Sequence, residues 1–394
     1  MTTTPSVNTL PPSGDPDVDW AARSMPLLAR TMRDYGPALR GRHIGICLHL
    51  EPKTAVLCQR LLETGAQVTV TGNLGTTDPA TAETLAGLGV EVIGRREDRE
   101  EEHSRNLDAV LARRPDLILD NGGELIERLI HGAPRSNLFL GATEETTTGG
   151  ARIRALATQP DFPVIVINDS PLKLLVENEY GVGQSIVQGF MNATNRMIPA
   201  LRAVVIGFGP CGKGVADTLR QLGARVTVVE IDPFRALEAI MGGHTVSSAL
   251  AALPSAQAVF LSTGKEGVVS GQEVDLLPDG AMIVGVGHEP NEIDRDRLAA
   301  TSVATRQLAA TGDVDARIGY SRADGRELVV LHDAKMINLT AAKGNPIEAM
   351  DLGLSLQAAS LSLIASGGVA FTGAAPVPDE INRSLASALV EVLR

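Results

Sequence analysis

This 394-residue sequence has few aromatic residues and few cysteines, and its basic residues do not outnumber its acidic residues. Aromatic residues make up 3% of the chain, which leaves few side chains on which single-stranded bases would stack. Lys and Arg number 35 against 47 Asp and Glu, and this net charge of −12 opposes binding to a phosphate backbone. Cys47, Cys58 and Cys211 form no C-x-x-C pair, which argues against a disulfide framework and a structural zinc site. We therefore expect no nucleic-acid partner, no metal and a cytoplasmic location.

Long apolar runs and targeting signals are also missing. No uninterrupted apolar run approaches the roughly 18 residues that a membrane-spanning helix needs. No polybasic segment is present that would bind an anionic membrane. Residues 1–19 are polar and proline-rich, which is typical of a disordered leader rather than a signal or transit peptide. We expect no membrane partner.

The sequence does contain a regular alternation of short β-branched runs and helical stretches. Continuous apolar strands separated by helices predict parallel sheets that are covered on both faces. The strands are expected at 43–50, 67–72, 117–119, 164–168, 203–206, 226–230, 259–261, 282–286 and 328–331. The expected fold class is α/β, with two doubly wound parallel-sheet domains and a cleft between them. The expected divisions are a substrate domain at 20–182, a Rossmann domain at 183–342 and C-terminal helices at 343–394.

A glycine-rich turn opens the second predicted domain. Gly207-Phe-Gly209-Pro-Cys-Gly212 follows a predicted strand and precedes a helical pattern. In that context the glycines allow a tight turn and close approach of the backbone to a pyrophosphate at the helix N-terminus. The next strand ends at Glu230, where a carboxylate accepts hydrogen bonds from ribose hydroxyls and repels a 2′-phosphate. The sequence therefore predicts NAD rather than NADP.

Three further segments point to one family: GATEETTTG at 141–149, NDSPLKLLVEN at 168–178 and GHEPNEID at 287–294. Together with GFGPCGKG at 207–214 and EIDP at 230–233, they resemble the S-adenosylhomocysteine hydrolase family. The resemblance runs from about residue 20 to residue 393. HLEPKT at 49–54 and YGVGQS at 180–185 are most similar to archaeal and thermophilic members.

The resemblance implies a redox cycle on a nucleoside. NAD takes a hydride from C3′, the ketone acidifies the C4′ proton, and the substituent on C5′ leaves; in the hydrolase, water then adds and the hydride returns. Lys173 would assist deprotonation of the C3′ hydroxyl, which requires burial or a neighbouring cation to lower its pKa. Glu145 would hold the 2′ hydroxyl, and His49 would face C5′, where the leaving group needs a proton.

The resemblance also implies two wider sets of contacts. Those expected near the substrate, several of them catalytic, are Glu51, Thr54, Asn121, Glu177, Asn178, His288, Asn345 and Met350. Those expected near NAD, besides the glycines and Glu230, are Thr146, Thr147, Thr148, Asn178, Ser262, Thr263, His288 and Asn338.

Simpler structural explanations exist for the same residues. Lys173 could be a solvated helix lysine, and His49 could be a structural residue at a strand end. Glu144 and Glu145 could be acidic residues that stabilise the first turn of a helix.

The sequence departs from the family mainly around the substrate. Asp120-Asn121 replaces two consecutive aspartates, so a group that could shuttle a proton near C5′ is absent. Glu177 stands where the family has an aspartate, Asn345 where it has a histidine, and Thr76-Thr77-Asp78 where it has Ser-Thr-Gln. The chain also stops at Arg394, short of the segment with which family members cover a neighbour's NAD.

These departures favour a relative that uses the same cycle on another adenine nucleoside. The preferred hypothesis is a dehydratase that eliminates water, similar to the enzyme that converts psicofuranine to angustmycin A in nucleoside-antibiotic biosynthesis. The alternatives are hydrolysis of S-adenosyl-L-homocysteine and a non-catalytic NAD-binding regulatory homologue. The helix expected at 346–365 is apolar on more than one face, so we expect it to pack partly against another subunit in a homodimer or homotetramer.

Overall fold

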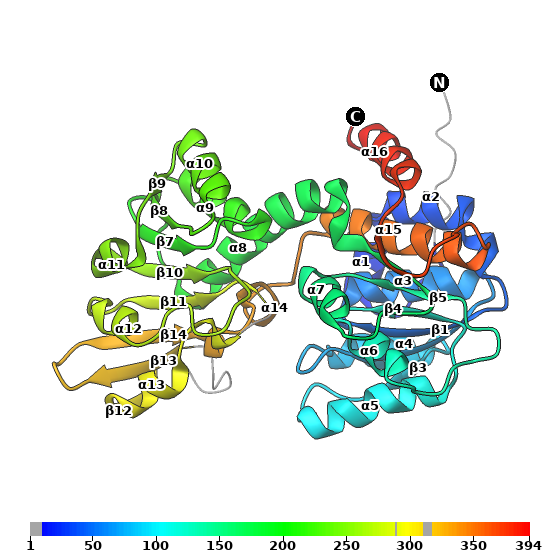
Figure 1. Cartoon of the computed structure of the whole chain (residues 1–394), viewed down its shortest axis with the longest axis horizontal. Helices are drawn as coiled ribbons and strands as arrows, with labels where there is room; N and C mark the ends of the chain where they lie inside the picture. The colour runs from blue at the N-terminus through cyan, green and yellow to red at the C-terminus, as the bar shows by residue number, and fades with distance from the viewer. Residues whose placement is uncertain (1–9, 288–289, 310–316) are drawn as a thin grey trace. The chain divides into compact units, whose positions relative to one another are not determined.

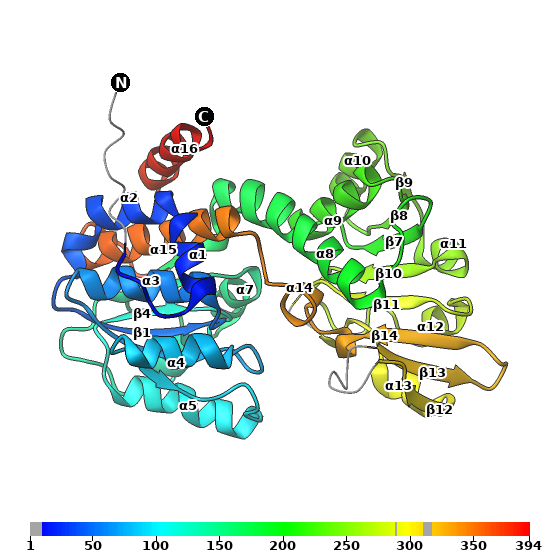
Figure 2. The ribbon, with the colours of Figure 1, turned by 180° about the vertical axis from the view of Figure 1, so that it is seen from behind.

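The computed structural model describes residues 10–287, 290–309 and 317–394. The chain divides into two compact units, drawn from opposite sides in Figures 1 and 2. Unit 1 comprises Met1–Leu174 and Ile347–Arg394, and unit 2 comprises Leu175–Pro346. The boundaries predicted from the sequence, after residues 182 and 342, fall a few residues away from these limits.

Unit 1 alternates strands and helices, and its C-terminal segment adds two helices and an edge strand. Its elements are α1 (Pro16–Arg23), α2 (Pro26–Asp34), β1 (His43–Leu48), α3 (Pro52–Glu63), β2 (Gln67–Gly72), α4 (Pro79–Gly87), β3 (Glu91–Ile93), α5 (Glu100–Ala112), β4 (Leu117–Asp120), α6 (Glu124–Ile130), β5 (Gly141–Glu144), α7 (Thr147–Ala155), β6 (Pro163–Val166), α15 (Ile347–Ala365), β15 (Gly373–Pro376) and α16 (Asp379–Leu393).

The described part of unit 1 holds a 7-stranded parallel sheet in the order β15-β6-β5-β4-β1-β2-β3. Leu107 of α5, Ile126 of α6 and Ile153 of α7 share one buried cluster with Cys47 and Val164 of the strands. Figure 1 shows α3 and α15 on the opposite face. Coverage on both faces explains why the strands read as nearly continuous apolar runs.

Helix α15 is apolar around its circumference and is buried inside unit 1. Leu352, Leu354, Leu356 and Leu361 have no exposed surface. By length and composition it could cross a membrane, but it packs against α2, α3, α16 and strands β4 and β5 of its own unit. Its own chain therefore buries most of this helix, so its apolar surface does not by itself require a second subunit, and the predicted homodimer or homotetramer stays a prediction.

Unit 2 contains a second sheet with helices around it. Its elements are α8 (Val182–Thr194), β7 (Arg202–Ile206), α9 (Pro210–Gln221), β8 (Arg225–Val229), α10 (Pro233–Met241), β9 (Thr245–Val246), α11 (Ala249–Ala252), β10 (Ala258–Leu261), α12 (Gln272–Leu276), β11 (Met282–Gly285), α13 (Arg295–Ala300), β12 (Ser302–Gln307), β13 (Arg317–Arg322), β14 (Glu327–Leu331) and α14 (Ile337–Thr340).

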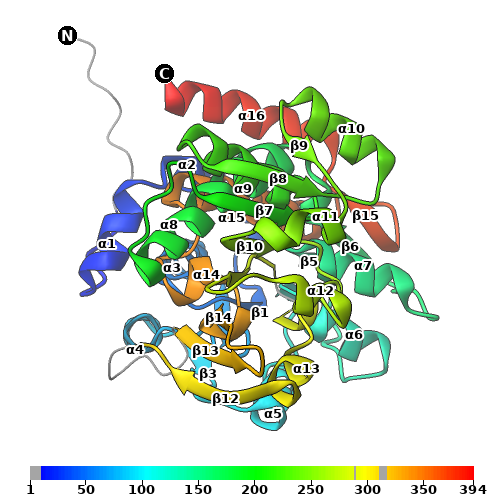
Figure 3. The ribbon, with the colours of Figure 1, turned by 90° about the vertical axis from the view of Figure 1, so that its left-hand side faces the viewer.

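The strand order in the described part of unit 2 is β12-β13-β14-β11-β10-β7-β8-β9. Strands β7, β8, β10, β11 and β14 are parallel, whereas β12 and β13 add an antiparallel edge that is visible in Figure 3. Phe190 of α8 packs on Phe260 of β10, with ring centroids 5.4 Å apart. The predicted α/β class is confirmed, and the sheet of unit 2 is mixed at one edge.

Helix α1 begins earlier than the sequence analysis expects. The Asp15 side chain accepts hydrogen bonds from the amides of Asp17 and Val18, and Pro16 occupies the first helical turn. An acidic N-cap followed by proline is a favourable helix start. Residues 16–19 are therefore helical and do not belong to a disordered leader.

Candidate active site

The carboxyl ends of the parallel strands in unit 1 carry several of the predicted substrate residues. His49 follows β1, Asn121 follows β4, and Glu145 follows β5, while Lys173 lies shortly after β6. These strands are consecutive neighbours in the sheet. Ligands of open α/β sheets bind outside this edge, so the sheet order brings the four residues to a suitable place.

Lys173, Glu145 and Gln357 form a buried polar cluster in unit 1. Lys173 Nζ lies 2.5 Å from Glu145 Oε1, and the Gln357 side-chain amide donates to Glu145 Oε2. Lys173 is 3% exposed, Glu145 4% and Gln357 0%. Lys173 is therefore not a solvated helix lysine, and its neighbouring charge is a carboxylate rather than a cation. A carboxylate acceptor beside an ammonium donor suits a vicinal diol.

Two further buried carboxyl groups shape the turns that carry this site. Asp120 Oδ1 accepts from the Asn121 amide over 3.0 Å, and Glu144 Oε1 accepts from the amides of Gly122 and Thr146 over 3.0 and 2.8 Å. Burial raises the pKa of both carboxyl groups, and the charge of Asp120 raises the pKa of Glu144 further. Glu144 ends β5 and lies outside α7, but its carboxylate accepts from the amide and the hydroxyl of Thr146, the N-cap of α7, so it also supports the start of that helix.

Asn121 presents an unsatisfied acceptor. Its side chain is 4% exposed, and its Oδ1 atom has no hydrogen-bond partner among the described residues. The Asn121 carbonyl accepts from Asn73 Nδ2 over 2.8 Å, which holds the backbone. A buried acceptor without a donor is costly, so a ligand hydroxyl or water would stabilise this position.

His49 is held from both its ring and its backbone. Its Nδ1 lies 3.0 Å from Thr76 Oγ1, and its carbonyl accepts from Thr54 Oγ1 over 2.7 Å. Thr54 is 2% exposed. Thr54, which the sequence analysis places at the substrate, thus uses its hydroxyl hydrogen on the histidine backbone.

Glu51 forms an ion pair with Lys53, with Oε2 and Nζ 2.6 Å apart. Lys53 is 4% exposed, and burial raises the pKa of Glu51 although Lys53 acts against this shift. The pair places an acceptor and a donor side by side at the start of α3.

The threonine run after Glu145 begins α7. Thr146 Oγ1 accepts from the Gly149 amide over 2.9 Å and donates to Glu144 Oε1 over 2.7 Å, so it is the N-cap of the helix. Thr147 Oγ1 accepts from Asn168 Nδ2 over 2.6 Å, and Thr148 is exposed. The predicted contacts of these threonines with NAD remain predictions.

In unit 2 the glycine turn follows β7 and opens α9. Gly207 has φ +94°, a conformation that favours glycine. A Cβ on Gly212 would lie 2.1 Å from Gly207 O and 2.5 Å from Ser262 Oγ. The turn and helix therefore pack too closely for a side chain at Gly212, and the helix N-terminus that begins here is suited to a phosphate.

The neighbouring polar residues hold this turn. Glu230, at the end of β8, accepts from the amides of Phe208 and Ile231 over 2.6 and 2.7 Å. Ser262 Oγ lies 2.8 Å from Ile206 O and 3.0 Å from Gly207 O, so its one hydrogen is directed at these two carbonyls. Thr263 Oγ1 donates to a carboxylate oxygen of buried Glu292 over 2.7 Å.

Comparison with known proteins identifies the family. A family model described as S-adenosyl-L-homocysteine hydrolase matches residues 9–139, and one described as the NAD-binding domain of that hydrolase matches residues 178–344. The S-inosyl-L-homocysteine hydrolase of Methanopyrus kandleri is 36% identical over 97% of this chain and 91% of its own. The chain belongs to the S-adenosyl-L-homocysteine hydrolase family. The adenosylhomocysteinase of Thermotoga maritima is 37% identical over 95% of this chain and 93% of its own. The S-inosyl-L-homocysteine hydrolase of Methanothermobacter thermautotrophicus is 37% identical over 89% and 85%.

The protein is an NAD-dependent enzyme of the S-adenosyl-L-homocysteine hydrolase family. The glycine cradle of unit 2 fits NAD: Gly207, Gly209 and Gly212 would hold the pyrophosphate at the start of α9, and Glu230 would face the ribose. The similar enzymes are named as hydrolases, so the preferred dehydratase has no support from them.

Three of the predicted site residues, Lys173, Glu177 and Asn178, lie on a π-helical segment, Lys173–Gly181. Such segments often mark functional sites. In unit 2, Asn345 connects two other predicted residues: its Oδ1 lies 3.1 Å from Asn338 Nδ2, and its Nδ2 lies 3.4 Å from Glu177 Oε1. Asn178 is 7% exposed.

Met350 and His288 are also predicted to lie near the substrate. Met350 lies on α15 and is partly buried. His288, predicted at both the substrate and the cofactor, lies outside the described residues.

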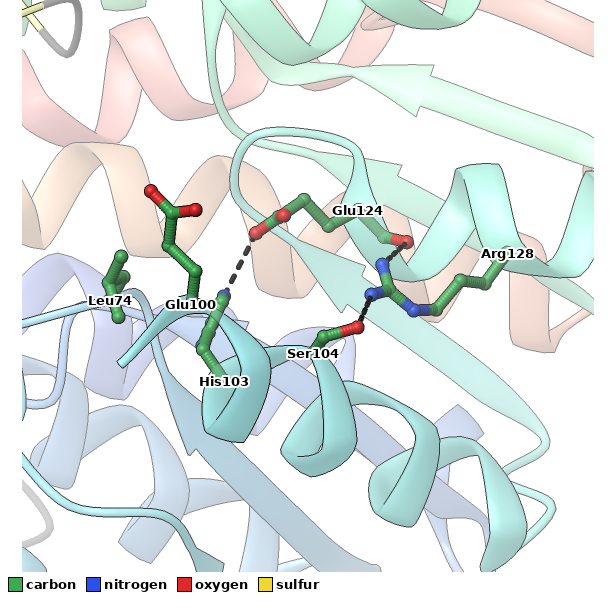
Figure 4. A pocket seen from close by; sticks show the side chains of 6 residues that line it. All are labelled: Leu74, Glu100, His103, Ser104, Glu124 and Arg128. Carbon is green, nitrogen blue, oxygen red and sulfur yellow. Dashed lines mark hydrogen bonds and ion pairs between the residues drawn. The ribbon is translucent and has the colours of Figure 1, made fainter. Parts of the chain in front are cut away.

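A separate cavity of about 290 Å³ lies between the starts of α5 and α6 (Figure 4). His103 Nε2 lies 3.0 Å from Glu124 Oε2 across it. The Arg128 guanidinium contacts Ser104 Oγ and Asp108 within unit 1. Its positive charge is already matched, so the cavity adds no evident anion site.

Gln357 is the residue that the sequence analysis misses. It lies on α15, which the sequence predicts only as an apolar helix. The available signal is an amide on a largely apolar helix, because a buried amide needs a partner, but the same helix also carries Asp351 and several serines. Its partner, Glu145, lies far away in the sequence.

Proposed function

We propose that this protein hydrolyses the thioether of a purine nucleosidyl homocysteine, S-adenosyl-L-homocysteine or S-inosyl-L-homocysteine, to the nucleoside and homocysteine. The observation that carries the proposal is the buried contact of Lys173, Glu145 and Gln357 at the strand ends of unit 1. The near full-length similarity to enzymes named as hydrolases of these two thioethers supports it.

The Lys173–Glu145 pair would bind the sugar diol. Glu145 accepts a hydrogen bond from one hydroxyl, and the Lys173 ammonium donates to the oxygen of the other. Burial excludes water and strengthens these contacts. Bound NAD would supply a hydride acceptor and donor for the C3′ carbon, and the Lys173–Glu145 pair would take the proton of the C3′ hydroxyl when the ketone forms and return it when the ketone is reduced.

His49 would exchange the proton at C5′. Asn121 can accept a hydrogen bond there, but its amide cannot carry a proton at neutral pH. Its unpartnered Oδ1 suits the water that adds to C5′. The histidine is then the proton carrier on this side of the sugar.

The base would be read by Glu51 and Lys53. Adenine presents an amino group that donates, whereas hypoxanthine presents an oxygen that accepts. The Glu51–Lys53 pair contains the complement of each, a carboxylate and an ammonium 2.6 Å apart. Both thioethers therefore belong in the test.

One observation favours dehydration as a second candidate. The unpartnered Asn121 Oδ1 would accept a hydrogen bond from a hydroxyl on C5′, whereas a thioether sulfur has no hydrogen to donate. Loss of water from a nucleoside with a free terminal hydroxymethyl group, such as psicofuranine, would use the same contact.

The test is mass spectrometry of separate incubations with S-adenosyl-L-homocysteine, S-inosyl-L-homocysteine and psicofuranine, each with NAD present. We expect homocysteine and a nucleoside from at least one thioether. A nucleoside product lighter by one water, without homocysteine from either thioether, would contradict hydrolysis and support the second candidate.

A further inference from the structure

The loop between β2 and α4, residues 73–78, connects the two residues proposed to act at C5′. His49 Nδ1 lies 3.0 Å from Thr76 Oγ1. Thr76 Oγ1 donates to Asn73 O over 2.8 Å, and Asn73 Nδ2 donates to Asn121 O over 2.8 Å. A continuous series of hydrogen bonds therefore runs from the imidazole ring to the turn that carries Asn121.

The donors and acceptors in these hydrogen bonds determine which nitrogen of the imidazole carries the hydrogen. A hydroxyl has one hydrogen, and Thr76 uses it on Asn73 O. Its contact with His49 Nδ1 is then a hydrogen bond only if the ring nitrogen donates. In the neutral ring the hydrogen lies on Nδ1 and the lone pair on Nε2.

We propose that Thr76 is a positioning residue that holds His49 as the Nδ1–H tautomer, so that Nε2 exchanges the proton at C5′. This inference rests on the proposed function. It adds to that function a tautomer and the residue that imposes it.

The loop is fixed to the backbone on both sides of the histidine. The backbone N–H of Asn73 donates to Leu48 O over 3.2 Å, and the backbone N–H of Asp78 donates to Leu50 O over 2.8 Å. Threonine is also stiffer at χ1 than the serine that the family resemblance places here, because it is branched at Cβ. The Thr76 hydroxyl therefore keeps a nearly constant direction toward the ring.

The proton balance at C5′ closes with one histidine. The C4′ carbanion beside the ketone supplies the electron pair of the new 4′,5′ double bond. The C5′–S bond breaks with its own pair on sulfur, and sulfur takes the Nε2 proton of the imidazolium to give a thiol. When water adds, one of its O–H bonds breaks, oxygen bonds to C5′, and the proton returns to Nε2. The electron pair of the 4′,5′ double bond moves to C4′, beside the ketone. Thr76 keeps Nδ1 protonated throughout.

The first test is nitrogen NMR of the full-length protein with NAD and ¹⁵N-labelled histidine. The His49 signals are assigned by their disappearance in His49→Gln. We expect an Nδ1–H tautomer in the parent, loss of that preference in Thr76→Val, and its retention in Thr76→Ser. An Nε2–H tautomer in the parent, or an unchanged tautomer in Thr76→Val, would overturn the proposal.

The second test is kinetic and uses S-adenosyl-L-homocysteine or S-inosyl-L-homocysteine, whichever is cleaved. Thr76→Val should lower kcat for homocysteine release by about 10- to 100-fold. It should leave the formation of NADH from the bound nucleoside much less affected, because that step occurs at C3′. Thr76→Ser should recover most of the loss.

A matched control is Thr77→Val, which makes the same chemical change one residue along the loop. If it slows homocysteine release as much as Thr76→Val, the effect is a general distortion of the loop and the proposal is wrong. Thr76→Ala replaces the valine variant if that one does not fold. The NMR result needs no turnover, so failure of the proposed function is distinguishable from failure of the tautomer assignment.

Discussion

The two units build their sites in different ways. In unit 2 the phosphate cradle comes from one turn, Gly207–Gly212, and the end of the next strand at Glu230. In unit 1 the polar cluster combines Glu145 after β5, Lys173 after β6 and Gln357 on α15. A site made by one short segment is visible as a spacing in the sequence. A site assembled from distant segments becomes visible only when the fold brings those segments together.

The largest effect is expected from a change in the Lys173–Glu145–Gln357 cluster that leaves the cofactor site intact. Lys173→Met removes the ammonium that contacts Glu145, so formation of NADH from a bound nucleoside should fall by at least about a hundredfold. NAD should stay bound, because the glycine cradle belongs to unit 2. Absorbance of reduced nicotinamide, together with the NAD content of the purified protein, measures both effects. Lys335→Met, at an exposed position, is the control. Equal rates in Lys173→Met and the parent would show that the buried ammonium has no part in oxidation.

The opposite result, weaker binding of NAD with the cluster of unit 1 intact, is expected from a change in the glycine turn. A methyl group at Gly212 would lie 2.1 Å from Gly207 O, so Gly212→Ala must displace the turn. Such overpacking costs about 1–3 kcal/mol, and we expect the affinity for NAD to fall by at least about tenfold. Calorimetric titration with NAD measures the loss. Gly87→Ala, where a methyl group meets nothing within 4 Å, should bind like the parent. Unchanged affinity in Gly212→Ala would mean that NAD does not depend on this close packing.

A smaller effect is expected at the turn after β4. Asn121→Asp adds an ionisable group near buried Asp120 and Glu144, whose pKa values are raised by burial. The new carboxyl group should also ionise late, so a gain of up to about tenfold in thioether turnover should appear as the pH rises. The pH profile of homocysteine release compared with the parent measures it. A gain that is present at low pH and lost as the pH rises would contradict this explanation.

The smallest expected effect concerns stability and leaves both sites intact. Asp351 of α15 accepts from the amides of Leu27 and Leu28 in α2, and burial raises its pKa to about 7. In the unfolded chain its pKa is about 3.9, so between these values the folded state binds more protons. This contribution to the unfolding free energy is present at low pH and is lost as the pH rises through about 7. Asp351→Asn should therefore flatten the dependence of Tm on pH between about 4 and 7.

The exposed Asp34→Asn change on α2 is the matched control for this measurement and should leave the slope of Tm against pH unchanged. A slope in Asp351→Asn that equals the slope of the parent would show that Asp351 does not titrate in this range.

The predictable part of the molecule is the part encoded locally. Apolar strands such as 203–206 and 282–286, and the turn at Gly207–Gly212, carry their own patterns, and the α/β class and NAD follow from them. The antiparallel strands β12 and β13 are missed because Ser302–Gln307 is largely exposed and lacks an apolar run. The short strand Gly373–Pro376 is missed because glycine, alanine and proline have little strand preference.

The site in unit 1 is predictable only through resemblance to the family. Nothing local in the sequence connects Lys173 with Glu145, and the position of Gln357 on a largely apolar helix indicates a buried partner without identifying it as Glu145. Thr54 and Thr146 are predicted from the resemblance to contact the substrate and NAD. In the structure the Thr54 hydroxyl bonds to the His49 backbone, and the Thr146 hydroxyl caps α7. A motif thus indicates that a residue type matters at a position but does not show which atom it contacts.

The π-helical segment Lys173–Gly181 has a consequence for how this stretch can vary. A π-turn holds one residue more than an α-turn, so removal of one residue would convert the segment to an ordinary α-helix. Neighbours around the helix axis would then be residues i and i+4 rather than i and i+5, so the side chains beyond the deletion would lie at other angles relative to Lys173. Glu177 and Asn178 would leave their present directions without any change in their identity. Apart from Lys173, Glu177 and Asn178 themselves, the stretch can therefore accept substitutions more readily than a change in its length.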